Sequence, residues 1–121
     1  MGDERSGVAA LDPDLLARLG ALCQEGSELW NRFDARVRRH GFHPFVPADY
    51  PVVLDALVSL RAPGLRFLEW GSATGVITIM ADLLGYDASG IEIDADLVEQ
   101  ARELARRTGS KASFSAGSFV P

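Results

Sequence analysis

A glycine-bounded turn at residues 69–75 constrains the fold of this chain more than any other feature of its sequence. The turn follows a short run at 65–70 that is apolar on both faces, and it precedes an apolar stretch with helical spacing at 76–84. A strand that is apolar on both faces is typical of a sheet covered on two sides. Strand, glycine turn and helix together predict the start of a βαβ unit, in which the backbone of the turn can approach a ligand closely.

The residues after this helix repeat the alternation of strand and helix. A second strand is predicted over 88–93, a helix capped by Asp94 follows it, and a weaker third strand covers 112–116. The order strand, helix, strand, helix, strand favours parallel pairing with right-handed crossovers. We therefore predict an α/β Rossmann-like half-domain over 49–121, with strand order 3-2-1 and helices on one face. The other face and the edge of the first strand would remain uncovered.

The N-terminal part of the chain is predicted to be helical. Asp12 as N-cap and Pro13 at the first helical position begin a long helix, with a break expected near Gly26. A loop rich in ring-bearing residues follows at 41–47, and a second helix begins at about residue 51 and ends at Pro63-Gly64. The expected organisation is a flexible terminus at 1–11, a helical segment with a lead-in loop at 12–48, and the half-domain at 49–121.

Composition and charge narrow the range of partners and compartments. The 121 residues carry a formal net charge of -5, which argues against a partner held mainly by counterion release from phosphates. Nucleic acid is therefore disfavoured, and the basic residues within 32–40 are interpreted as a solvated helix terminus rather than an RNA-binding patch. Cys23 is the single cysteine, and neither a secretory signal nor a membrane span is apparent, so we expect a cytoplasmic protein without contact to a membrane.

Two carboxylates stand beside the glycine turn. Glu69 precedes the turn, and Glu92 ends the following strand. In a parallel sheet, a carboxylate at the second position can accept both hydroxyls of a ribose laid across the strand ends. Taken singly, Glu69 is as well explained by an interaction with the dipole of the following helix as by ligand binding. Glu92 and Asp94 are likewise as well explained as capping acids of the next helix. Together with the glycine turn they favour a nucleotide-type site.

The residues of the turn distinguish between kinds of nucleotide ligand. A P-loop requires Gly-Lys-Ser or Gly-Lys-Thr at the helix start, whereas Gly75 is followed by Val76 and Ile77. A dinucleotide fingerprint requires glycine at the positions of Ala73 and Val76. These departures disfavour nucleoside triphosphates, NAD and FAD. The remaining class is a ligand with a ribose and with a cationic or amino-acid portion near Glu69.

Segment 67–75, Phe-Leu-Glu-Trp-Gly-Ser-Ala-Thr-Gly, resembles motif I of the class I S-adenosylmethionine-dependent methyltransferases, and segment 90–94 resembles their second motif. In that family the motif I turn passes beside the methionine part of the cofactor, and the acid that ends the second strand holds the ribose. The resemblance implies S-adenosyl-L-methionine as cofactor. By resemblance its binding residues are Glu69, Gly71, Ser72, Ala73, Thr74, Gly75, Glu92 and Ile93.

Two flanking segments extend the resemblance, which covers roughly residues 45–121. Residues 114–121 resemble the third motif, where Ser118 replaces the acid that usually receives the adenine amino group, so that adenine recognition is either weakened or left to the backbone of Phe119. Phe45 and Pro47 belong to a segment like the lead-in that closes over the cofactor in some members of the family.

Family members continue beyond the third strand, so the chain is expected to be a truncated, N-terminal cofactor-binding portion of a methyltransferase. The methyl acceptor and the catalytic residues cannot be assigned, because the segments that form the acceptor side are missing. The alternative is a non-catalytic S-adenosylmethionine-binding or dimerisation module that pairs with itself or a partner chain through the exposed sheet. No metal site is expected, because His40 and His43 lack partners at ligand spacing.

Overall fold

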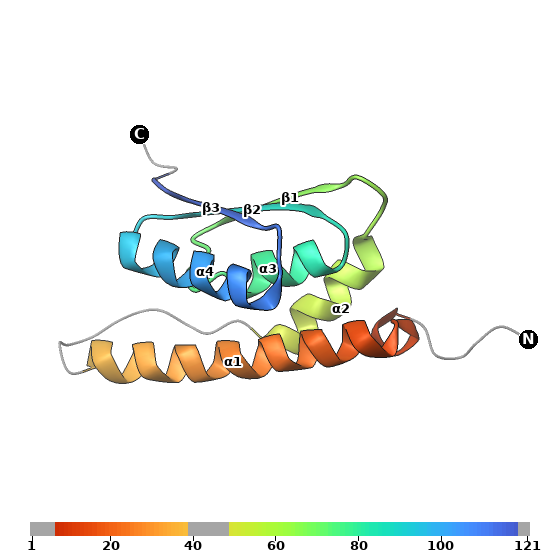
Figure 1. Ribbon diagram of the computed structural model, residues 1–121, viewed down its shortest axis with the longest axis horizontal. Helices are drawn as coiled ribbons and strands as arrows, with labels where there is room; N and C mark the ends of the chain where they lie inside the picture. Colours follow the sequence, from red (N-terminus) through yellow and green to blue (C-terminus); the bar gives the residue numbers. More distant parts are fainter. Residues whose placement is uncertain (1–6, 39–48, 119–121) are drawn as a thin grey trace, which may run out of the picture.

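The computed structural model describes residues 7–38 and 49–118 (Figure 1). Phe45, Pro47 and Phe119 lie outside the described residues. In chain order the elements are η1 (Gly7–Ala10), α1 (Pro13–Arg38), α2 (Tyr50–Leu60), β1 (Arg66–Trp70), α3 (Val76–Leu83), β2 (Asp87–Glu92), α4 (Ala95–Thr108) and β3 (Ser113–Ala116).

The three strands form one parallel sheet in the order β1-β2-β3, so β2 is central and β1 and β3 are the edges. In this register Leu68 lies opposite Ser89, and Ser89 lies opposite Ser113. Each strand is connected to the next through a helix, as parallel pairing requires. The predicted α/β class and strand order are confirmed.

Both crossover helices lie on one face of the sheet, and α1 lies beneath them as a further layer (Figure 1). The core between these layers contains Ile79 and Met80 of α3 and Leu104 of α4, which are fully buried, and α1 contributes Leu19 and Leu22. The α4 helix begins as predicted, since the Asp94 side chain accepts hydrogen bonds from the N–H groups of Asp96 and Leu97.

The expected break of the N-terminal helix near Gly26 is wrong, because α1 runs without interruption from Pro13 to Arg38. A Cβ atom at Gly26 would lie 2.7 Å from Cγ2 of Val76 and 3.0 Å from the hydroxyl of Tyr50. Glycine at this position therefore lets α1 pack closely against the starts of α2 and α3. Its function in the fold is tertiary packing rather than a change of chain direction.

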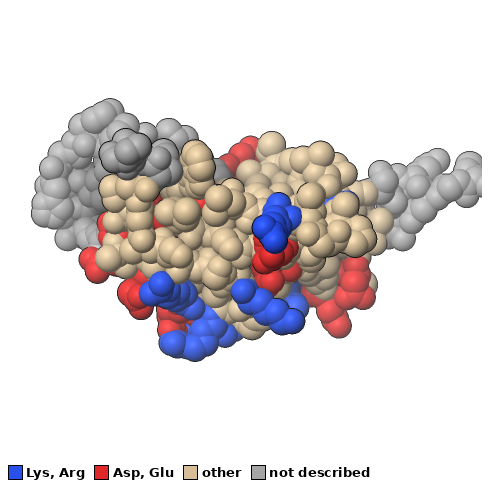
Figure 2. All heavy atoms as spheres, turned by 90° about the horizontal axis from the view of Figure 1, so that it is seen from above, with Lys and Arg blue, Asp and Glu red and all other residues tan. Residues whose placement is uncertain are grey.

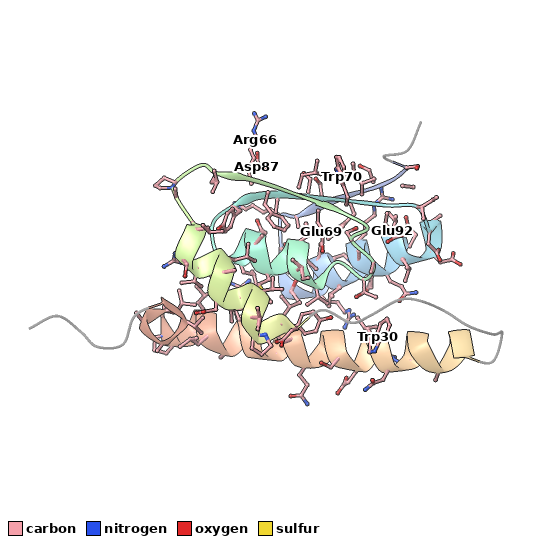
Figure 3. All side chains as sticks on the ribbon, turned by 180° about the vertical axis from the view of Figure 1, so that it is seen from behind. Trp30, Arg66, Glu69, Trp70, Asp87 and Glu92 are labelled. Carbon is pink, nitrogen blue, oxygen red and sulfur yellow. The ribbon has the colours of Figure 1, made fainter. Side chains whose placement is uncertain are left out.

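Among residues 7–38 and 49–118, no element covers the face of the sheet opposite the helices, as predicted. Leu68 is 55% exposed, Trp70 is 60% exposed, and Ile93, just after β2, is 76% exposed. Figure 2 looks onto the molecule from this side and shows a broad area without charged side chains. Arg66 and Asp87 also point away from the helices (Figure 3), and they lie opposite each other in neighbouring strands.

Candidate functional site

The turn between β1 and α3 has an unusual backbone. Gly71, Ala73 and Gly75 all have positive φ angles, of 74°, 50° and 84°. Glycine adopts this region at little cost, whereas alanine does not. The N–H groups of Gly71 and Ser72 both donate to the carbonyl of Ile91, at 2.8 and 3.1 Å, so the turn is anchored on β2.

The two glycines that bound the turn have different surroundings. A Cβ atom at Gly71 would meet no other atom within 4 Å. At Gly75 it would lie 2.7 Å from Cβ of Ala101 and 2.7 Å from Cζ of Phe114. Gly71 therefore leaves open space beside the backbone, whereas Gly75 permits the turn to pack on α4 and β3. Only the first arrangement offers a close approach to a ligand.

Glu92 is 7% exposed and connects the turn to the end of β2. Its Oε1 accepts the N–H of Ala73 at 2.9 Å, and its Oε2 accepts the N–H of Asp94 at 2.9 Å. Charge-assisted bonds of this kind are stronger than neutral ones and offset the strained φ of Ala73. Each carboxylate oxygen has two lone pairs, so each keeps one for a further donor such as a ribose hydroxyl.

Glu69 points from β1 toward the helix layer (Figure 3). Its Oε1 accepts the hydroxyl of Thr78 at 2.7 Å, and the backbone N–H of Thr78 is a second donor. Burial raises the pKa of Glu69 to about 7, the two hydrogen bonds from Thr78 oppose that rise, and the charge of Glu92 adds to it. Near neutral pH the side chain is therefore present in both charged and neutral forms.

Glu69 also lies where its alternative interpretation, a partner of the α3 helix dipole, places it, and in addition it caps the start of that helix. The N-cap of α3 is Gly75, and it provides no side-chain hydrogen bond to the helix start. The carboxylate of Glu69 accepts hydrogen bonds from Thr78 in the first turn of α3, so it satisfies an N–H group that has no partner within the helix. The dipole of α3 also favours a negative charge at this end of the helix. The capping role and a role in ligand binding are compatible, because only part of the acceptor capacity of the carboxylate is used.

Tyr50, which lies near Glu69, and Cys23, which lies near Tyr50, were not assigned to the site from the sequence. Burial raises the pKa of Tyr50, and the charges of Cys23 and Glu69 raise it further. Tyr50 begins α2, capped by Asp49, and Cys23 lies in α1 one turn before Gly26. The proximity of Tyr50 to Glu69 and to Cys23 depends on how α1 and α2 pack, and no local pattern in the sequence indicates it.

The remaining predicted site residues divide into buried and exposed. Ser72 is 4% exposed, and its Oγ has no hydrogen-bond partner in the structure. This hydroxyl faces the core, since it would lie 2.8 Å from a Cβ atom at Gly90. Ile93 is exposed, and Thr74 is partly exposed. Ser118 is exposed and lies near the end of β2, because the N–H of Gly117 donates to the carbonyl of Glu92 at 3.0 Å.

The structure therefore brings the turn, Glu69, Glu92 and Ile93 together at the carboxyl edge of the sheet. Within residues 7–38 and 49–118, no group of three or more His, Cys, Asp or Glu side chains is arranged to hold a metal ion. No helix among these same residues combines the length and apolar character needed to span a bilayer.

Three methyltransferases are similar to this chain in sequence or fold. The ribosomal protein L11 methyltransferase of Thermus thermophilus is 37% identical over 68 residues, which are 56% of this chain and 27% of that protein. An RNA methyltransferase from Salinibacter ruber, solved in complex with S-adenosyl-L-homocysteine, is 35% identical with a TM-score of 0.51, over 60% of this chain and 50% of that one.

The tRNA (uracil-54, C5)-methyltransferase of Pyrococcus abyssi, also solved in complex with S-adenosyl-L-homocysteine, is 21% identical with a TM-score of 0.49, over 61% of this chain and 19% of that one. No protein-family model matches the chain.

These matches confirm the predicted Rossmann-like fold and the resemblance to class I S-adenosylmethionine-dependent methyltransferases. The chain spans about a quarter of the length of the curated relative and half that of the Salinibacter ruber structure. The similarity is thus to a part of each protein, as expected for a cofactor-binding portion.

Proposed function

We propose that this chain binds S-adenosyl-L-methionine at the carboxyl edge of its sheet and forms the N-terminal cofactor-binding portion of a methyltransferase. The observation that carries the proposal is the position of Glu92. Its buried carboxylate is held by the N–H of Ala73 in the turn, next to the open space at Gly71. The acceptor capacity left on Glu92 suits the two hydroxyls of a ribose.

The described residues suit each part of the proposed cofactor. Glu92 would hold the ribose, and the exposed Ile93 would pack on the adenine, with Ser118 nearby at the end of β3. Gly71 and Thr74 would lie along the methionine portion, and Glu69 would face its cationic end. The bound cofactor supplies a sulfonium methyl group that an acceptor nucleophile attacks. The contribution of these residues is to bind and orient the donor.

The acceptor class stays open between protein and RNA. One relative is a ribosomal protein methyltransferase, and the solved relative from Salinibacter ruber is an RNA methyltransferase. The expectation from net charge that nucleic acid is disfavoured receives no support from these relatives. We propose a cytoplasmic location, which the free Cys23 thiol supports.

A second candidate function is a non-catalytic module that binds the cofactor and assembles through its sheet. The observation that favours it is the sheet face with Leu68 and Trp70 more than half exposed, next to a β1 edge on which no other described strand pairs. On either proposal the cofactor site is the same. Methyl transfer by the chain, measured with RNA and with protein acceptors, distinguishes an enzyme from a binding module.

Calorimetric titration with S-adenosyl-L-homocysteine tests the cofactor site. Glu92→Ala should weaken binding by about 1.5–3 kcal/mol, roughly 10- to 150-fold, because charge-assisted hydrogen bonds to the ribose are lost. Glu28→Gln, an exposed substitution on α1, is the matched control and should bind like the parent chain. Thermal melts without ligand establish that each variant is folded. Unchanged affinity in a folded Glu92→Ala variant would show that the ribose assignment is wrong.

A further inference from the structure

The side chain of Phe114, in β3, is buried beneath the end of the turn. A Cβ atom at Gly75 would lie 2.7 Å from Cζ of this ring, and a Cβ atom at Gly90 in β2 would lie 2.9 Å from its Cδ1. One edge of the ring therefore runs from the central strand to the end of the turn and fills the space that the two glycines leave. Because the packing is this close, the position of Gly75 depends on the position of the ring.

The strand that carries Phe114 is held on two sides. In the sheet, Phe114 lies opposite Gly90. On the side of α4, its carbonyl accepts hydrogen bonds from Nε and Nη2 of Arg102, at 3.2 and 2.8 Å. A guanidinium that donates twice to one oxygen fixes its direction as well as its distance. The ring is therefore positioned by β2 and α4, before any ligand binds.

The two ends of the turn are held in different ways. At its start, two N–H groups donate to the carbonyl of Ile91 in β2. At its end, Gly75 donates to the carbonyl of Ser72 within the turn itself and packs on Phe114. The positive φ of Ala73, between the two ends, is costly and persists only where the surroundings fix it. Packing on Phe114 is thus part of what holds the turn in its strained conformation.

We propose that Phe114 is a positioning residue of the cofactor site, and that its rigid ring edge holds the turn where the backbone can bind the amino-acid portion of the ligand. The inference rests on the proposed function, in which the methionine portion lies along the turn. Phe114 acts through Gly75, because its own side chain is buried in the core. The ribose depends less on the ring, because Glu92 is also held by the N–H of Asp94.

The two halves of the ligand should therefore respond differently when the ring is replaced. Phe114→Met keeps most of the apolar volume but loses the rigid edge, because methionine is unbranched and flexible. S-adenosyl-L-homocysteine should bind this variant about tenfold more weakly, since a shift of about 1 Å is enough to misplace the groups of the turn. 5′-Methylthioadenosine, which keeps the adenosine but lacks the amino-acid portion, should bind within about twofold of its affinity for the parent.

Two further variants separate positioning from stability. Leu19→Met introduces the same flexible side chain at another fully buried position, in α1, and should change the affinity for neither ligand. Arg102→Met removes the two hydrogen bonds to the Phe114 carbonyl from a half-exposed position and leaves the core volume unchanged. It should separate the two ligands in the same way as Phe114→Met, with a smaller loss, about threefold, for S-adenosyl-L-homocysteine.

Calorimetric titration measures both affinities, and thermal melts without ligand establish which variants are folded. If Phe114→Met does not fold, the result for Arg102→Met decides. Equal weakening of both ligands in the folded variants, or unchanged binding of both, would overturn the inference and leave the cofactor proposal intact. Failure of the parent to bind either ligand would instead overturn the proposed function and the inference with it.

Discussion

The turn at residues 71–75 has two sides that differ in what they contact. Its underside packs on the core, where Gly75 meets Ala101 and Phe114, and Ser72 meets Gly90. Its open side borders free space at Gly71. The same few residues therefore serve the fold on one side and leave backbone available for a ligand on the other. This difference indicates which substitutions will affect stability and which will affect binding.

Substitutions at Gly71 and Gly75 should show the largest difference between the two sides of the turn in their effects on stability and binding. Gly75→Val adds a branched side chain at a φ of 84° and forces contacts near 2.7 Å with α4 and β3, so it should destabilise the chain by about 4 kcal/mol or more. A Cβ atom at Gly71 meets no atom within 4 Å, so Gly71→Val should cost only about 1–2 kcal/mol through its φ of 74°, while abolishing measurable binding of S-adenosyl-L-homocysteine. Chemical denaturation and calorimetry measure the two effects. Equal losses of stability in both variants would contradict the division of the turn into two sides.

Glu69 lies in β1, two residues before the turn, and gives a pH-dependent contrast with exposed carboxylates. Its folded pKa is raised from 4.5 to about 7, so the folded chain holds this proton more tightly than the unfolded chain. The contribution of Glu69 to stability is therefore fully present below about pH 4.5 and is lost as pH rises toward 7, by up to about 3 kcal/mol.

Glu69→Gln should remove the loss of folding stability that Glu69 causes as pH rises, so the variant should become more stable relative to the parent toward pH 7. Urea denaturation at several pH values compares the two chains, with Glu28→Gln as the control for exposed carboxylates. Parallel curves for the parent and Glu69→Gln would mean that Glu69 is solvated and not buried as described.

Ser72 should show the smallest effect. Its buried Oγ makes no hydrogen bond in the structure, so removing it removes an uncompensated polar group. Ser72→Ala should leave the free energy of unfolding unchanged or raise it by about 0.5–1 kcal/mol, and binding should stay within about twofold of the parent. A loss of more than about 1 kcal/mol in denaturation would show that the hydroxyl has a stabilising partner.

The sequence predicted the strands, the helices and the two acids because their signals are local. Asp94 as an N-cap, the strand before Gly71 and the acid at the end of β2 are each defined by a few neighbouring residues. The packing role of Gly26 could not be predicted, since it depends on Val76 and Tyr50 from other elements.

The direction in which each residue of the turn faces could not be predicted from the sequence either. The pattern that resembles motif I does not distinguish Ser72 and Gly75, which face the core, from Gly71, which borders open space. Whether a turn residue faces the core or a ligand depends on how the turn folds back onto β2 through the Ile91 carbonyl. That contact joins segments about twenty residues apart, and no local pattern specifies it.

The central claim is a direct contact between Glu92 and the ribose, and a double-mutant cycle tests it most directly. The affinities of S-adenosyl-L-homocysteine and of its 2′,3′-dideoxyribose analogue are compared in the parent chain and in Glu92→Gln. A direct contact predicts that the variant loses affinity for the first ligand and not for the second, with a coupling energy of at least about 1 kcal/mol. Equal losses for both ligands, with a coupling energy near zero, would contradict the assignment of Glu92 to the ribose.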